Sequence, residues 1–338
     1  MWRARRLLGN AAILLLVATA LGGCSTKRDP RDLFAPSGVG TIVVDATLVV
    51  GRYFPIVRLR RTLSPEVPYD PGAAAVVGAT VSIEGPGGAM LYADRPFTPG
   101  AYEAVDFNGT IDAVVQPDAT YRLVVRTLDG RSVAATTTTP GAFRVSDWLR
   151  LDEPTLAVRG SLRRFSDYPV DPDSAYAAPE NRIVYQDGLV EARFDRGDAL
   201  AFQVGLKNLE SDSPYVIDAD FLSDHDLQSL SRDSSSPALD ATENSIRLPW
   251  LAIYFAGRYT IRIFSIDRNW YDLARSLPSF GGTNLGFGTN AGDSFERPIF
   301  HVQGGIGLFG SAAVDSVGIT ILPKPCLLYT SPSPRDTR

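Results

Sequence analysis

Four aspartates within nine residues form the densest group of potential metal ligands in the sequence. They are Asp218, Asp220, Asp224 and Asp226. Ca²⁺ accepts carboxylate oxygens as ligands, but this segment lacks the loop glycine and the terminal glutamate of an EF-hand. Two interpretations stay open, a calcium site and a solvated acidic loop, and a run of charge on a loop is usually hydrated.

The chain has only two histidines, and the sequence around them makes no clear catalytic motif. His225 lies in the segment 223–226 (SDHD), which superficially offers a nucleophile, a base and an orienting carboxylate. A triad needs those groups to converge in space, which neighbouring loop residues rarely do. His301 is interpreted as a half-buried strand residue. We therefore predict no enzyme activity and no cofactor, while a carboxylate pair for glycoside hydrolysis stays open because its separation is a three-dimensional quantity.

Glycines at 305, 307 and 310 spell the pattern G-x-G-x-x-G. A dinucleotide site requires a strand before that pattern, a helix after it, and an acidic residue about 20 positions later. Here the following residues, 312–322, have a strand-like composition. We expect the glycines to lie in a strand, where they permit close backbone approach or a bulge.

Four aromatic residues of the C-terminal half have two interpretations, as core packing or as the lining of a sugar- or peptide-binding surface. They are Trp250, Tyr254, Trp270 and Tyr271. Buried aromatic rings dominate the energetics of protein cores. We expect these four to be packing residues.

The N-terminus has the pattern of a secretory signal. Three arginines in the first six residues precede an apolar run over 11–21, which is shorter than the roughly 20 residues that a membrane-spanning helix needs. The run ends in Leu21-Gly22-Gly23-Cys24, which resembles the lipobox of bacterial lipoproteins. That resemblance implies cleavage of 1–23, acylation of Cys24 and, because Ser25 is not acidic, a lipid anchor in the outer membrane on an undetermined face. Residues 24–38 are polar and contain prolines, so we predict a flexible tether.

The last fourteen residues, 325–338, do not continue the preceding pattern. They resemble a translated sequencing-adapter tail, and we predict that they are not native. Excluding this tail removes Cys326 and leaves Cys24 as the one cysteine, so no disulfide or zinc site is expected. Removing the three arginines of the signal and the single net positive charge of the tail takes the net charge from −5 to −9. An acidic body argues against a nucleic-acid partner.

The remaining sequence predicts an all-β fold with minor α structure. Short β-branched segments separated by turns over 39–140 predict an immunoglobulin-like β-sandwich, with hairpins at Gly85–Gly88 and at Asp129-Gly130. A second β-rich domain is predicted over 141–324. Its expected elements are strands at 189–194 and 199–207, a hairpin of 246–255 with 259–267, and one helix over 268–277.

The order of several short motifs along the chain resembles bacterial lipoproteins catalogued as domain of unknown function 4249. The motifs follow the lipobox and are Val77 to Ile83 (VGATVSI), Pro99-Gly100-Ala101-Tyr102, Tyr121-x-Leu-x-Val, Ala134 to Pro140 (AATTTTP), Ile263 to Tyr271 (IFSIDRNWY) and Val302 to Gly310 (VQGGIGLFG). Each is loose alone, and together they cover residues 24–323. The family is known mainly from envelopes in which its members often accompany TonB-dependent outer-membrane receptors, and it has no assigned activity.

Anchoring, the lack of catalytic motifs and this resemblance lead to one functional prediction. We expect a cell-envelope lipoprotein, held to the membrane through acylated Cys24, that acts as a non-enzymatic binding or accessory protein. Its partner would be an outer-membrane receptor or an extracellular ligand. Two alternatives stay open: an envelope hydrolase with a carboxylate site in the second domain, and a structural component of the envelope.

Overall fold

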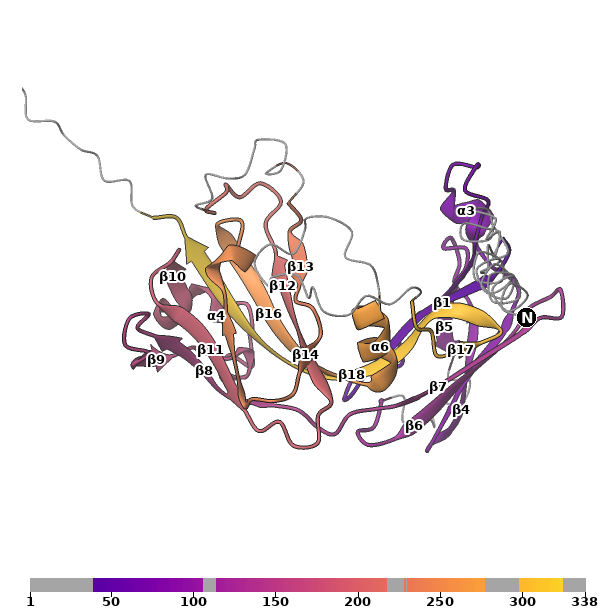
Figure 1. Cartoon of the computed structure of the whole chain (residues 1–338), viewed down its shortest axis with the longest axis horizontal. Helices are drawn as coiled ribbons and strands as arrows, with labels where there is room; N and C mark the ends of the chain where they lie inside the picture. Colours follow the sequence, from indigo (N-terminus) through magenta and orange to yellow (C-terminus); the bar gives the residue numbers. More distant parts are fainter. Residues whose placement is uncertain (1–38, 106–113, 218–227, 229, 277–297, 325–338) are drawn as a thin grey trace, which may run out of the picture. The chain divides into compact units, whose positions relative to one another are not determined.

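The computed structural model describes residues 39–105, 114–217, 228, 230–276 and 298–324 (Figure 1). Strands dominate these ranges and helices are few and short, so the predicted all-β class with minor α structure is confirmed. Contacts divide the chain into two units, 1–40 with 62–69, and 41–61 with 70–338. In the smaller unit, the amide of Gly40 donates to the carbonyl of Thr62 at 2.8 Å. The fold and the sites described below all belong to the larger unit.

The first half of the larger unit is built from strands that alternate between buried and exposed residues, the pattern of a sheet with one face on a core. These strands are β1 (Ile42–Val49), β2 (Val57–Arg61), β3 (Thr80–Gly85), β4 (Gly88–Asp94), β5 (Ala101–Val105), β6 (Thr120–Arg126) and β7 (Ser132–Thr138). They lie on one hydrogen-bonded path in the order β1-β2-β5-β4-β3-β6-β7. The short helix α3 (Pro71–Ala74) precedes β3. Val81 and Ile83 of β3 are buried in the core of this half.

Both predicted hairpins of this half are confirmed. Gly85 pairs with Gly88 where β3 turns into β4, and Gly88 adopts a φ of 108° that only glycine accepts readily. The turn from β6 to β7 contains Asp129 and Gly130, with a φ of 82° at Gly130. The carboxylate of Asp129 accepts hydrogen bonds from Thr127 and Arg131, which closes this turn.

One long strand near the C-terminus connects this half to the second. Strand β18 (Gly305–Leu322) follows β17 (Val302–Gln303) and pairs in parallel with β1, antiparallel with β16 and in parallel with β10. Figure 1 shows it as a single yellow strand from β17 toward β10. Because β17 also pairs with β7, the path of the first half closes on itself. Residues of β18 contribute to both hydrophobic cores, Phe309 to the first and Ile319 to the second.

The glycines at 305–310 lie inside β18, as predicted. Gly307 has a φ of 105°, and a Cβ atom there would lie 2.1 Å from the carbonyl oxygen of Val44 on β1. A side chain is therefore excluded by the neighbouring backbone. The pattern G-x-G-x-x-G serves close strand approach here, and β18 continues beyond it to Leu322 where a dinucleotide site would have a helix.

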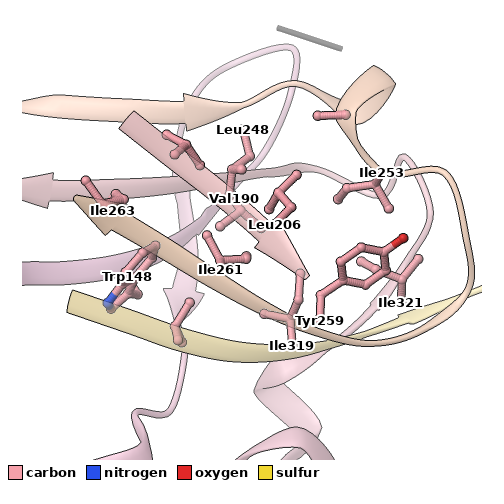
Figure 2. Packing of buried hydrophobic residues seen from close by; sticks show 14 of the residues in the cluster. Trp148, Val190, Leu206, Leu248, Ile253, Tyr259, Ile261, Ile263, Ile319 and Ile321 are labelled. Carbon is pink, nitrogen blue, oxygen red and sulfur yellow. The ribbon is translucent and has the colours of Figure 1, made fainter. Parts of the chain in front are cut away.

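The second half places a four-stranded sheet against the continuation of the large sheet. The small sheet has the order β15-β11-β8-β9, formed by β8 (Val145–Leu151), β9 (Val158–Ser161), β11 (Leu189–Phe194) and β15 (Ser245–Leu248). The large sheet continues with β10 (Arg182–Val184), β12 (Ala201–Asn208), β13 (Asp233–Ser235), β14 (Leu239–Asp240) and β16 (Gly257–Ile266). Figure 2 shows Trp148 and Val190 of the small sheet packed with Ile261 and Ile319 of the large one.

The helical segments of the described ranges are short. Besides α3 they include α4 (Ser174–Ala177), α6 (Arg268–Ser276), and the 3₁₀ turns η1 (Phe165–Asp167), η2 (Pro179–Asn181) and η3 (Trp250–Ala252). The predicted helix over 268–277 is confirmed as α6. None of the helices in the described ranges is long and apolar enough to cross a membrane.

The predicted hairpin of 246–255 with 259–267 is wrong. Strand β15 pairs with β11 in the small sheet, whereas β16 lies between β12 and β18 in the large sheet. The extended segment ends at Pro249, which has no amide hydrogen to donate, and the chain then forms η3. Trp250 packs its ring against Tyr185, with 5.4 Å between centroids, and so directs the chain from one sheet to the other.

Candidate functional site

Several residues singled out from the sequence lie outside the described residues. They are Cys24, Cys326, His225 and the aspartates at 218, 220, 224 and 226. Within the described ranges, no three or more histidine, cysteine, aspartate or glutamate side chains gather closely enough to hold a metal ion. The calcium interpretation of the acidic segment therefore stays a prediction.

His301 differs from its expected role. It is exposed and lies before β17 rather than within a strand, and its Nε2 atom is 2.8 Å from the Oδ2 atom of Asp272 on α6. The local sequence Phe300-His301-Val302 has the alternation of a strand, but β17 begins only at Val302. The imidazole belongs to a surface contact with α6.

The four aromatic residues considered as a binding surface are packing residues, as expected. Trp250, Tyr254 and Tyr271 are buried, and the indole Nε1 of Trp250 donates to the carbonyl of Gly188 at 2.7 Å. Trp270 is partly buried and packs against Phe264. Their rings face protein rather than solvent, so they offer little surface to a sugar or peptide.

The most unusual polar arrangement in the described residues is a buried carboxylate between two exposed arginines. Glu191, in the middle of β11, has a side chain that is only 2% exposed. Its Oε1 atom accepts a hydrogen bond from Nε of Arg193 at 2.6 Å, and its Oε2 atom accepts one from Nε of Arg247 at 2.6 Å. We call Glu191, Arg193 and Arg247 the arginine pair site.

Strand geometry explains how these three residues meet. Successive side chains of a strand point to opposite faces, so Val190, Ala192 and Phe194 enter the core while Glu191 and Arg193 share the outer face. Arg247 on β15 is directly opposite Glu191 in the register of the two strands. Leu149 on β8, the partner of Glu191 on its other side, is buried as well. The carboxylate is thus covered by its neighbours although it lies on the outer face of the small sheet.

The electrostatics of the site hold Glu191 in its ionised form. Desolvation opposes ionisation, but the hydrogen bonds and charges of Arg247 and Arg193 outweigh it and keep the pKa of Glu191 below its ordinary value. Both guanidinium groups use Nε toward Glu191, and about half of each side chain remains exposed. The site carries one net positive charge on an otherwise acidic chain.

Fixed guanidinium groups are suited to binding anions. The planar fork of arginine presents Nη donors that match a carboxylate or phosphate in bidentate geometry. In the described part of the chain, these Nη groups form no hydrogen bond or ion pair with another protein group. Because Glu191 already orders both arginine side chains, binding of an anion would cost little additional side-chain conformational entropy.

A second buried carboxylate lies where the two halves meet. Asp267 accepts the amide hydrogen of Trp270 at 3.0 Å, the N-cap interaction of α6, and the hydroxyl of Thr137 on β7 at 2.5 Å. The hydroxyl of Ser311 on β18 lies 2.8 Å from that of Thr137. Burial raises the pKa of Asp267 above its ordinary value. We call Asp267, Thr137 and Ser311 the junction cluster.

The described residues also enclose a hollow of about 240 Å³ at the β3–β4 turn. Its lining is formed by Phe54, Gly85, Pro86, Gly87, Gly88, Met90, Val114, Gln116 and Tyr121. No carboxylate or histidine is among these residues, so neither Glu191 nor Asp267 faces this hollow. It offers an apolar and aromatic surface without acid–base groups.

Most of the chain matches one known protein family. Residues 34–317 match the family described as a domain of unknown function (DUF4249). The chain belongs to this family. The match spans both halves of the DUF4249 fold, including the arginine pair site and the junction cluster, and it confirms the family expected from the sequence. No curated protein matches the chain.

The sequence contained only part of the signal for these sites. Glu191 and Arg193 stand two residues apart in a predicted strand, which places them on one face, but nothing local indicates that Arg247 would lie opposite them. Asp267 precedes a predicted helix and is a recognisable N-cap type, whereas its partners Thr137 and Ser311 are more than 40 residues away.

Proposed function

We propose that this DUF4249 protein is a lipid-anchored protein of the bacterial outer membrane that binds a partner without catalysing a reaction. The observation that carries the proposal is the position of Cys24, three residues after the apolar run and within Leu21-Gly22-Gly23-Cys24. Acyl chains on one residue each contribute about 0.8 kcal/mol per buried methylene, which is enough for stable anchoring when several chains are present.

The two buried carboxylates described above, Glu191 and Asp267, support binding rather than hydrolysis. A glycosidase needs two carboxyl groups that face the same substrate. Asp267 is committed to capping α6 and to Thr137, and Glu191 is committed to two arginines. The arginine pair site, by contrast, has exposed donors available to a partner. We propose that it binds a carboxylate or phosphate group on an outer-membrane receptor or on an extracellular ligand.

The anchoring part of the proposal is tested by mass spectrometry of protein purified from its native membrane. An N-terminal peptide that begins at acylated Cys24 is expected, and a Cys24→Ser variant should yield only uncut, unacylated chain in the same analysis. An unmodified Cys24 in the native protein, or a signal peptide that is still present, would contradict anchoring at this residue.

The binding part is tested by co-purification from detergent-solubilised membranes. A receptor of the TonB-dependent class is the expected partner, and Arg193→Ala with Arg247→Ala should reduce its recovery. The matched control replaces Arg95 and Arg122, which are also exposed and paired with glutamates. Equal recovery with all variants would remove the arginine pair site from the interface, and no co-purifying protein would favour a structural role in the envelope.

A further inference from the structure

Three large apolar side chains of the first half are exposed at turns rather than buried in its core. Phe97 is fully exposed, Leu128 is 82% exposed and Val77 is 53% exposed. Single exposed apolar residues are common on protein surfaces, but a group of them on adjacent turns marks a contact surface. We call these three residues the apolar tip.

Strand pairing shows that the three turns lie at the same end of the sheet. Val77 precedes β3, Phe97 follows β4 and Leu128 follows β6. The first residues of β3 pair with the last residues of β4 and of β6, since Val81 is opposite Tyr92 and Thr80 is opposite Arg126. The three side chains therefore come from neighbouring strand ends.

Specific contacts hold these turns together around Gly78. The amide of Gly78 donates to the Oδ2 atom of Asp94 at 2.8 Å, which ties the Val77 turn to the end of β4. A Cβ atom on Gly78 would lie 2.7 Å from Cδ1 of Leu128, so Leu128 lies directly over that turn. Tyr102 on β5 adds a buried hydroxyl that donates to the carbonyl of Val76 at 2.8 Å. These contacts fix the turns of the apolar tip relative to one another.

Phe97 is presented by a strained backbone. Its φ of 62° is in the left-handed region, which is unfavourable for a bulky residue other than glycine. The turn is closed by hydrogen bonds from Thr98 to Arg95 and from Ala101 to Thr98. Strain of this kind at a fully exposed aromatic side chain indicates a role outside the fold.

The chain enters the folded body at this same end. Ile42, the first residue of β1, pairs with Arg61 at the end of β2. The amide of Leu59, close to that end, donates to the carbonyl of Gly100, three residues after Phe97. The N-terminal segment is therefore joined to the body at the end that carries the apolar tip. Residues 25–41 separate Cys24 from β1, and the 18 steps from Cys24 to Ile42 span at most about 65 Å in a fully extended chain.

We infer that the apolar tip inserts into the lipid surface to which Cys24 anchors the chain, an inference that rests on the proposed anchoring. A tether that enters at this end brings the tip, rather than the opposite end of the sheet, toward the bilayer. The three turns contain Asp94 and Asp129 against Arg95, Arg126 and Arg131, so their charges nearly cancel. Contact therefore comes from apolar burial and requires no anionic lipid.

The test uses the mature chain with Cys24→Ala, so that acylation contributes nothing, and sucrose-loaded vesicles of pure phosphatidylcholine. Co-sedimentation at millimolar lipid gives the partition coefficient. Phe97→Ser with Leu128→Ser should lower it by at least about tenfold, because two large side chains lose their burial. The matched control is Val170→Ser, which removes a side chain that is 98% exposed in the second half and should leave partitioning unchanged. Raising the salt concentration should have no effect.

Three results would overturn the inference: a parent chain that does not sediment with these vesicles, equal partitioning of the double variant and the parent, or partitioning that requires anionic lipid. Thermal unfolding of the double variant should stay close to that of the parent, since Phe97 is fully exposed and Leu128, which touches the Gly78 turn, is 82% exposed. Failure here is distinct from failure of the anchor, because acylation is read from the native N-terminus by mass spectrometry. An acylated protein whose tip does not partition would contradict only the tip.

Discussion

Replacing Asp267 separates the hydrogen-bonding role of this side chain from the cost of its charge. Asp267→Ala removes the N-cap acceptor of α6, worth about 0.5–2 kcal/mol. It also removes one hydrogen bond of the buried Thr137 hydroxyl, which keeps the hydroxyl of Ser311 as a partner, at a cost of about 0.5–1.5 kcal/mol. The alanine variant should therefore lose about 1–3.5 kcal/mol of unfolding free energy. Asp267→Asn keeps an oxygen for the amide of Trp270 and offers an amide to Thr137, so its loss should stay near 1 kcal/mol.

The two variants should also differ in their dependence on pH. Burial raises the pKa of Asp267 in the folded state above its unfolded value. The folded state then binds the proton more tightly, so the stabilisation is complete below the unfolded pKa and is lost as pH rises through the folded pKa. Asparagine does not titrate. The unfolding free energy of Asp267→Asn should therefore improve relative to the parent as pH rises from about 4 to 8.

Urea unfolding at both pH values measures these differences, with Asp233→Asn as the control. Asp233 lies on β13 with a side chain that is 68% exposed, so its replacement should change the unfolding free energy by less than about 0.5 kcal/mol. An asparagine variant as unstable as the alanine variant, with no gain at higher pH, would refute the reasoning. It would mean that the junction cluster needs the ionised carboxylate.

Two further substitutions test the arginine pair site and the glycine strand. Glu191→Gln should lower the unfolding free energy by about 2 kcal/mol at pH 7, less than the 3–5 kcal/mol for breaking a fully buried pair, because both arginines are half exposed. This cost should shrink as pH falls through the lowered pKa of Glu191. A cost that does not change with pH in urea unfolding would contradict this prediction. Gly307→Ala should cost more than about 3 kcal/mol or prevent folding, because its Cβ meets the carbonyl of Val44, whereas Gly87→Ala, which meets nothing, should be tolerated. Equal soluble yield and melting temperature of the two alanine variants would show that strand approach does not exclude a side chain.

Local patterns were sufficient wherever the structure is determined by neighbouring residues. The hairpin at Asp129-Gly130 needs only a φ > 0 position between two strand-forming segments, and both are visible in the sequence. Helix α6, which has about two and a half turns, shows an apolar face and an aspartate at its N-cap. The all-β class followed from the same information, because many short alternating segments outnumber the helical ones.

Partners distant in sequence could not be deduced in this way. The segments 246–255 and 259–267 have the composition of two strands joined by a turn, and the sequence gives no local reason for them to enter different sheets. That outcome depends on two long-range contacts: the ring of Trp250 packs against Tyr185, and β15 pairs with the edge of β11. The arginine pair site depends on the same pairing of β15 with β11, so the sequence could not predict that its three residues meet.

Strand β18 explains why the two halves are best treated as one folding problem. Its early residues pair with β1, more than 250 positions earlier in the chain, and its later residues lie between β16 and β10. Until β18 pairs with β1, the first core lacks Phe309 and the second core lacks Val317 and Ile319. Contacts this distant in sequence are slow to form because loop closure comes before any stabilisation. Until β18 is placed, β1 has one unpaired edge, and Gly305 and Gly307 let the strand approach that edge closely enough to complete the first core.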